Sequence, residues 1–193
     1  MRNNSWRHFT SPVFWLATSL ALFVTALSLA SWPSEARAQP GDHDESRIKQ
    51  GLAIAPLPLD LQGKNRALVG LGSYFVNGPG DCNGCHTVDF SPYLPGGDPF
   101  LGEPEQIDPD RYLVGGSAFG PFVSRNLRPD PATGLPAGLT FAEFLLTMRT
   151  GHDLKNIPPA PLLQVMPWPN FRKMTDRDLA AIYEYLRALP PAP

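Results

Sequence analysis

Three segments of the chain show apolar residues that recur every three or four positions, the pattern of an amphipathic helix. The first covers residues 64–76, the second starts at Thr140 and the third starts at Thr175. Their apolar faces are formed by Leu68, Leu71 and Phe75, by Phe141, Phe144, Leu145 and Met148, and by Leu179, Ile182, Tyr183 and Leu186. The pattern therefore predicts three helices, each with one buried face.

The residues at the ends of these segments support the same assignment. Thr140 and Thr175 each offer a hydroxyl as N-cap, and Glu143 and Asp178 stand three residues later, as a capping box requires. The expected stops are Asn77-Gly78, Gly151 and Pro190. Gly72, inside the first helix, costs about 1 kcal/mol relative to alanine, so we expect another helix to cross closely there.

The remainder of the chain is rich in turn-forming residues, with 23 Pro and 17 Gly in 193 residues. Residues 39–63 show no sustained period and are interpreted as an extended arm or linker, with His43 in solvent. Residues 88–139 are loop-rich, and no segment shows strong strand alternation. The predicted fold class is mainly α, with three or more helices joined by long loops.

The chemistry of the chain is concentrated in residues 82–86, which read Cys82-Asn83-Gly84-Cys85-His86 and contain both of its cysteines. Two cysteines three positions apart, followed at once by histidine, are the attachment signature of a c-type haem. Each thiol can add to one vinyl group of the porphyrin while the imidazole reaches the iron. The motif predicts one covalently bound haem c, with His86 as an iron ligand.

Two other interpretations of the cysteine pair remain open. A dithiol oxidoreductase also uses C-x-x-C, but at the start of a helix in a βαβ pattern, and no such pattern is present. A structural zinc site usually has four Cys or His ligands, and Cys82, Cys85 and His86 have no second cluster to complete it.

The first 38 residues have the features of an export signal. Arg2 and Arg7 precede the apolar residues 13–30, and Ala36-Arg37-Ala38 offers small residues where a signal peptidase cleaves. We expect export to a periplasm with cleavage after Ala38. The alternative is an uncleaved membrane anchor, which would be the chain's expected contact with a membrane.

Removal of residues 1–38 leaves 155 residues, enough for one domain with a core. Lys and Arg then number 13 and Asp and Glu 17, so the net charge changes from −2 to −4. A mildly acidic surface argues against nucleic acid as a partner and is compatible with a basic redox partner. The expected division is a signal peptide over 1–38, the arm over 39–63 and one domain over 64–193.

The sixth iron ligand is predicted to be Met166. It stands before Pro167 in the proline-rich residues 157–169, where we expect no helix and a stiff, extended backbone. The other candidates are His152, which follows Gly151, then Met148, Met174 and His43. Met148 fits a core role and Met174 a contact next to the Thr175 cap.

Methionine opposite histidine raises the reduction potential relative to two imidazoles, and two filled axial positions disfavour chemistry with oxygen or peroxide. The pattern thus favours an electron carrier that is not itself an enzyme. The alternative from another class is a haem enzyme or small-ligand sensor, in which Met166 dissociates or His152 replaces it.

Residues 64–190 resemble a class I, single-haem cytochrome c, and more closely the cytochrome c domains of periplasmic alcohol, aldehyde and gluconate dehydrogenases. The resemblance is carried by the segments Tyr74 to Asn77, Gly80 to Cys82, Asn126 to Asp130, Thr133 to Leu135, Thr140 to Phe144, Arg149 to Gly151, Met166 to Pro169 and Asp176 to Pro191. Where the family usually has threonine, this chain has Arg128.

The resemblance implies a cytochrome c fold whose first and last helices cross beside the haem, which would explain Gly72. It implies thioether bonds at Cys82 and Cys85, with His86 proximal and Met166 distal. It also implies that a periplasmic dehydrogenase donates electrons and that a downstream cytochrome or oxidase of the respiratory chain accepts them.

Overall fold

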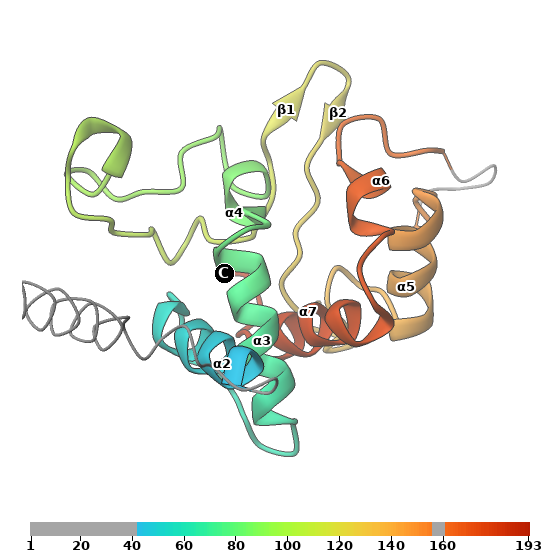
Figure 1. Cartoon of the computed structure of the whole chain (residues 1–193). Helices are drawn as coiled ribbons and strands as arrows, with labels where there is room; N and C mark the ends of the chain where they lie inside the picture. Colours follow the sequence, from blue (N-terminus) through green and yellow to red (C-terminus); the bar gives the residue numbers. More distant parts are fainter. Residues whose placement is uncertain (1–41, 156–160) are drawn as a thin grey trace, which may run out of the picture. The chain divides into compact units, whose positions relative to one another are not determined.

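The computed structural model describes residues 42–155 and 161–193, whose regular structure is mainly helical, so the predicted mainly α class is confirmed (Figure 1). Six α-helices, one 3₁₀ helix and a two-stranded antiparallel hairpin are present in these residues. Their bounds are α2 Asp42–Ile54, α3 Arg66–Asn77, α4 Cys82–Cys85, η2 Pro99–Leu101, β1 Ala118–Phe119, β2 Phe122–Val123, α5 Phe141–Thr150, α6 Trp168–Phe171 and α7 Asp176–Ala188.

The three predicted helices correspond to α3, α5 and α7. Both predicted capping boxes are present. The Thr140 and Thr175 hydroxyls accept hydrogen bonds from the backbone N–H groups of Glu143 and Asp178, whose carboxylates accept from the threonine backbone N–H groups. Helix α3 starts two residues later than expected, after Asn65, whose side chain accepts hydrogen bonds from two backbone N–H groups. Local capping chemistry therefore sets where these helices begin.

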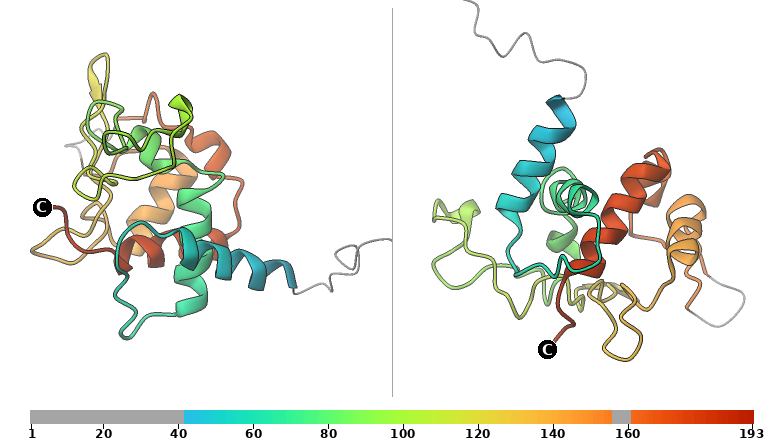
Figure 2. Two further views of the ribbon diagram at one scale, coloured as in Figure 1. Left: turned by 90° about the vertical axis from the view of Figure 1, so that its left-hand side faces the viewer. Right: turned by 90° about the horizontal axis from the view of Figure 1, so that it is seen from below.

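The close crossing predicted at Gly72 is also confirmed, and the crossing helix is α7 (Figure 2). A Cβ atom built on Gly72 would lie 1.9 Å from the Ala181 carbonyl oxygen and 2.7 Å from Cβ of Tyr185. The two backbones thus touch at a point where only glycine fits. Helix α5 packs on α7 farther along the chain.

Residues 39–63 were predicted to be an extended arm, and this is wrong for residues 42–54, which form helix α2. The helix packs on α3 through Gly51 and Gly70, where an added Cβ would lie 1.9 Å and 2.7 Å from backbone oxygens of the other helix. The buried Ser73 hydroxyl donates to the Gly51 carbonyl at 2.6 Å. The Ile48 and Leu52 side chains also lie against Gly70, but two apolar residues on one face form too short a stripe for periodicity to detect.

A buried polar network joins α3 and α7 to Tyr112, which lies in a loop. The Tyr112 and Tyr185 hydroxyls lie 2.6 Å apart, and the Tyr112 hydroxyl donates to the Asn77 Oδ1 atom at 2.5 Å. Asn77 Nδ2 donates to the Tyr185 hydroxyl at 3.1 Å and to the Ser73 hydroxyl at 2.9 Å. Both tyrosine side chains are fully buried, so these bonds satisfy groups that water does not reach.

Residues 88–111, drawn in light green, project from the helices as a separate lobe (Figure 1). The lobe carries the whole acidic excess, with six Asp and Glu against Arg111, whereas the rest of 39–193 has 11 acidic and 12 basic residues. Phe100 and Leu101 in η2 are 87% and 75% exposed. The lobe is held by local bonds, including that from the Asp98 backbone N–H to Glu103 Oε2.

The predicted signal peptide over residues 1–38 lies outside the described residues. Within 42–155 and 161–193, none of the helices combines the length and the apolar character needed to span a bilayer.

Candidate haem site

The cysteine motif lies at the point where α3 turns into α4. The turn needs glycine at position 80, because a Cβ there would lie 2.5 Å from the Phe75 carbonyl oxygen. Cys82 and Cys85 are the first and last residues of the one-turn helix α4, and the His86 backbone N–H closes it on the Cys82 carbonyl at 2.8 Å. The turn thus places two thiols and one imidazole within five residues.

A backbone carbonyl from a distant loop orients the His86 ring. Its Nδ1 atom lies 2.7 Å from the Arg125 carbonyl oxygen, so Nδ1 carries the proton and Nε2 keeps its lone pair. Burial lowers the pKa of His86 and keeps the imidazole neutral. A neutral ring with a fixed Nε2 lone pair is what ligation of a metal requires.

The two thiols do not have the electrostatics of a catalytic dithiol. Burial raises the pKa of Cys82 to about 12, and burial together with the Asp81 carboxylate raises the pKa of Cys85. Dithiol oxidoreductases instead stabilise the thiolate of the attacking cysteine.

Within the described residues, no three His, Cys, Asp or Glu side chains are grouped so as to hold a metal ion.

Cys82, Cys85, His86 and Met166 all line one cavity of about 580 Å³. Such a volume is within the range of about 300–1,000 Å³ typical of small-molecule and cofactor sites. The rest of the wall is mostly apolar and comes from the hairpin, α5, α7 and the loops of residues 124–139 and 161–167. It includes Phe119, Phe122, Phe144, Met148, Ile182 and Leu186.

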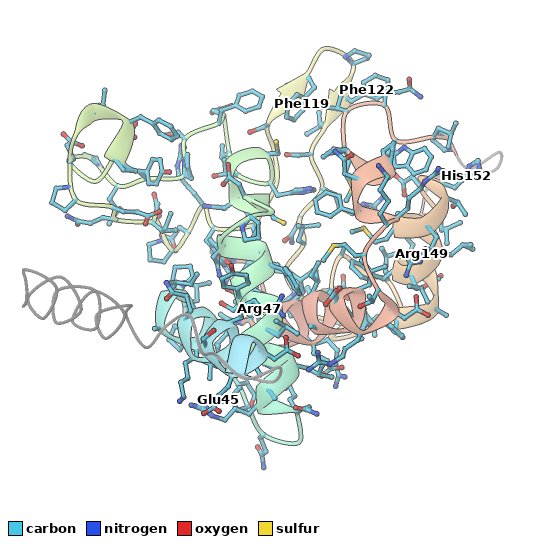
Figure 3. All side chains as sticks on the ribbon, in the orientation of Figure 1. Glu45, Arg47, Phe119, Phe122, Arg149 and His152 are labelled. Atoms are coloured by element: carbon cyan, nitrogen blue, oxygen red, sulfur yellow. The ribbon has the colours of Figure 1, made fainter. Side chains whose placement is uncertain are left out.

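The cavity separates the candidates for the sixth ligand into two groups. Met166 and Met148 line it, whereas Met174 and His152 do not. His152 is exposed at the end of α5 (Figure 3). The side chain of His43, and residues 156–160 of the proline-rich segment, lie outside the described residues.

The segment before and after Met166 differs in one respect from its prediction. Helix α6 begins at Trp168, inside the residues 157–169 that were expected to be free of helix. Pro169 is tolerated because the first turn of a helix has no use for its backbone N–H. Met166 precedes this turn, and its carbonyl accepts from the Trp168 N–H at 2.8 Å.

Sequence reasoning missed several side-chain contacts that build this region, including those of Arg128, which it had noted only as a departure from the family. Arg125 and Asp153 form an ion pair in the cavity wall, with Arg125 Nη2 2.5 Å from Asp153 Oδ1. Arg128 is buried, and its guanidinium donates to the Pro109, Pro190 and Pro191 carbonyls. These contacts join residues 19 to 63 positions apart, so no local pattern could reveal them.

The residues present fit a covalently bound haem. The cavity combines an apolar wall, two thiols, an oriented imidazole and a thioether, which are the donor types of a c-type centre. The Thr147 Oγ1 atom in this wall is buried and has no hydrogen-bond partner among the described residues, so a polar group of a bound molecule could satisfy it.

Comparison with known proteins finds several dehydrogenase subunits that are similar to part of this chain. The chain is 34% identical over 127 residues to the cytochrome c subunit of a quinone-dependent alcohol dehydrogenase from Gluconacetobacter polyoxogenes, covering 63% of this chain. It is 32% identical over 121 residues, again 63% of the chain, to the gluconate 2-dehydrogenase cytochrome c subunit of Pantoea cypripedii. A nicotinate dehydrogenase subunit from Pseudomonas putida is 33% identical over 118 residues, 60% of the chain.

The matches span only part of these relatives, 24% and 23% of the two cytochrome c subunits and 8% of the nicotinate dehydrogenase subunit. No family model and no solved structure matches the chain. The resemblance expected from the motifs is nevertheless confirmed: over some three fifths of its length, this chain is similar to the cytochrome c subunits of dehydrogenases.

Proposed function

We propose that the protein transfers electrons through one haem c, attached at Cys82 and Cys85 and ligated by His86 and Met166. The observation that carries the proposal is that these four residues line one cavity in which the His86 ring is already oriented by the Arg125 carbonyl. The haem supplies a one-electron centre whose potential the protein sets through its axial ligands and its burial.

The protein's own residues perform three tasks in this proposal. The Arg125 carbonyl holds the His86 ring so that only Nε2 is available to a metal. The apolar side chains of the hairpin, α5 and α7 would pack against the bound haem and shield it from water, which favours the less charged state of the centre. The thioether of Met166, a soft and neutral ligand, favours ferrous iron.

The proposed partners follow from the relatives and from the charge distribution. Several relatives are cytochrome c subunits of dehydrogenases, so we propose a periplasmic dehydrogenase as electron donor and a downstream cytochrome or oxidase as acceptor. The acidic lobe of residues 88–111 favours a partner with a basic surface. A periplasmic location, with cleavage after Ala38, remains part of the proposal.

The test is expression of the full chain with the machinery that attaches haem. The expected product carries one haem by mass, retains it in denaturant, shows the methionine-to-iron charge-transfer band when oxidised and binds carbon monoxide slowly when reduced. Met166→Ala should abolish the band, lower the potential and speed carbon monoxide binding.

Met148→Leu is the matched control, because Met148 lines the same cavity and leucine preserves its volume. It should leave the band in place. If Met148→Leu lost the band and Met166→Ala kept it, Met148 and not Met166 would be the iron ligand. Rapid binding of carbon monoxide by the unaltered protein would favour a haem enzyme or sensor, and free thiols without haem would favour a dithiol oxidoreductase.

A further inference from the structure

Arg125 forms bonds with two parts of the cavity wall, the segment of His86 and the segment of Asp153, which pairs with the residues before Met166. Its carbonyl oxygen accepts the His86 Nδ1–H bond at 2.7 Å. Its guanidinium donates from Nη2 to Asp153 Oδ1 at 2.5 Å. One residue thus orients the imidazole through its backbone and binds a different segment through its side chain.

Asp153 belongs to a short ladder that leads directly to Met166. The Asp153 backbone N–H donates to the Pro161 carbonyl at 2.9 Å, and the Leu163 N–H donates to the Gly151 carbonyl at 2.8 Å. His152 and Leu162 form the antiparallel bridge between these two bonds. Met166 follows Leu163 by three residues, so the ladder ends close to Met166 in the sequence.

The ion pair is sheltered enough to influence the loop. The side chains of Arg125 and Asp153 are 33% and 13% exposed, and both line the cavity. A charge-assisted bond in such surroundings is stronger than one on an open surface. Asp153 Oδ1 also accepts from the Lys155 backbone N–H at 3.1 Å, so the carboxylate connects Arg125 to the chain that follows α5.

We propose that Arg125 is a positioning residue that couples the two axial sides of the site. Its guanidinium, through Asp153, holds the ladder of residues 151–153 and 161–163, and thereby keeps the Met166 thioether in place opposite a ring that its own carbonyl orients. The inference rests on the proposed ligation by His86 and Met166. Loss of the pair frees the methionine segment without altering any ligand.

The test compares variants of the haem-loaded full chain. Arg125→Ala and Asp153→Asn remove the pair but keep the backbone carbonyl that orients His86, whereas Arg125→Lys keeps the charge. Arg177→Ala is the matched control, because it removes the exposed Arg177–Asp44 pair between α7 and α2, neither residue of which lines the cavity. The measurements are the methionine-to-iron band, the carbon monoxide association rate of the reduced form and global unfolding.

Breaking the pair should raise the population of the methionine-dissociated state, so carbon monoxide association should be about tenfold faster in Arg125→Ala and Asp153→Asn. Their band should weaken on warming at temperatures where the helices remain folded. The double variant should resemble either single one, because both remove the same interaction. Arg125→Lys should retain at least part of the wild-type behaviour, and Arg177→Ala all of it.

Wild-type band stability and carbon monoxide rates in both Arg125→Ala and Asp153→Asn would refute the coupling while leaving the proposed function intact. Equal changes in Arg177→Ala would refute it as well, since the effect would then be general destabilisation. An unaltered protein that lacks the band would refute the proposed ligation itself.

Discussion

The crossing of α3 and α7 at Gly72 provides the sharpest test of the fold. In Gly72→Ala, the new methyl group would lie 1.9 Å from the Ala181 carbonyl oxygen and 2.5 Å from the Ala181 carbonyl carbon. Both atoms belong to the backbone of a 13-residue helix, so a side-chain rotation cannot relieve the clash. One helix must move away from the other.

The magnitude follows from two opposing effects. Alanine restricts the unfolded chain and is the better helix former, which stabilises by about 0.4–1 kcal/mol. Overpacking in a dense core costs about 1–3 kcal/mol, and we expect the upper end because backbone is displaced. The net loss should be about 2 kcal/mol of unfolding free energy, which lowers Tm by about 4–8 °C in a domain of this size.

The assay is urea unfolding of the haem-loaded protein, followed by circular dichroism for Gly72→Ala and for Gly72→Ala combined with Ala181→Gly. Removal of the Ala181 methyl should not rescue the variant, because the clash is with its carbonyl group. Gly72→Ala as stable as wild type, or fully restored by Ala181→Gly, would refute the backbone contact.

Three further outcomes are expected. Arg128→Ala should lose about 3 kcal/mol of unfolding free energy in urea, because three carbonyl groups lose a charged donor; no loss would contradict a structural role for this residue. Burial raises the pKa of Tyr112 and Tyr185 above that of tyrosine in the unfolded chain. The stability that depends on their neutral forms is therefore present below about pH 10 and lost as the pH rises further. The urea midpoint should fall above pH 10, and it should fall less steeply in Tyr185→Phe. Thr175→Ala should cost about 1 kcal/mol through loss of the α7 cap, whereas Thr175→Ser should stay near wild type by the same measurement.

The elements that sequence analysis predicted correctly are those whose signals are local. Thr140 and Thr175 each stand three residues before the acidic partner that completes the capping box, and the apolar faces of α3, α5 and α7 repeat along the chain. Gly72 was informative because it is unfavourable in its own helix, which indicates a contact with another one.

The features that were missed depend on contacts between distant residues. Helix α2 is polar and joins α3 through Gly51, so its sequence resembles a linker until α3 is placed beside it. Arg125 looks like any loop arginine until the fold brings its carbonyl to His86, 39 residues earlier in the chain. The predicted haem-attachment motif, by contrast, consists of five consecutive residues.

Helix α3 packs closely against two helices, α2 at Gly70 and α7 at Gly72. The chain continues from α3 directly into the segment of Cys82 and His86. Backbones in direct contact leave little room for adjustment, because dense interiors resist compression. An electron moves much faster than atoms do, so the speed of its transfer depends on how little the surroundings rearrange between two oxidation states. A redox centre attached next to so tightly packed a helix would therefore have a small reorganisation energy for each electron that it transfers.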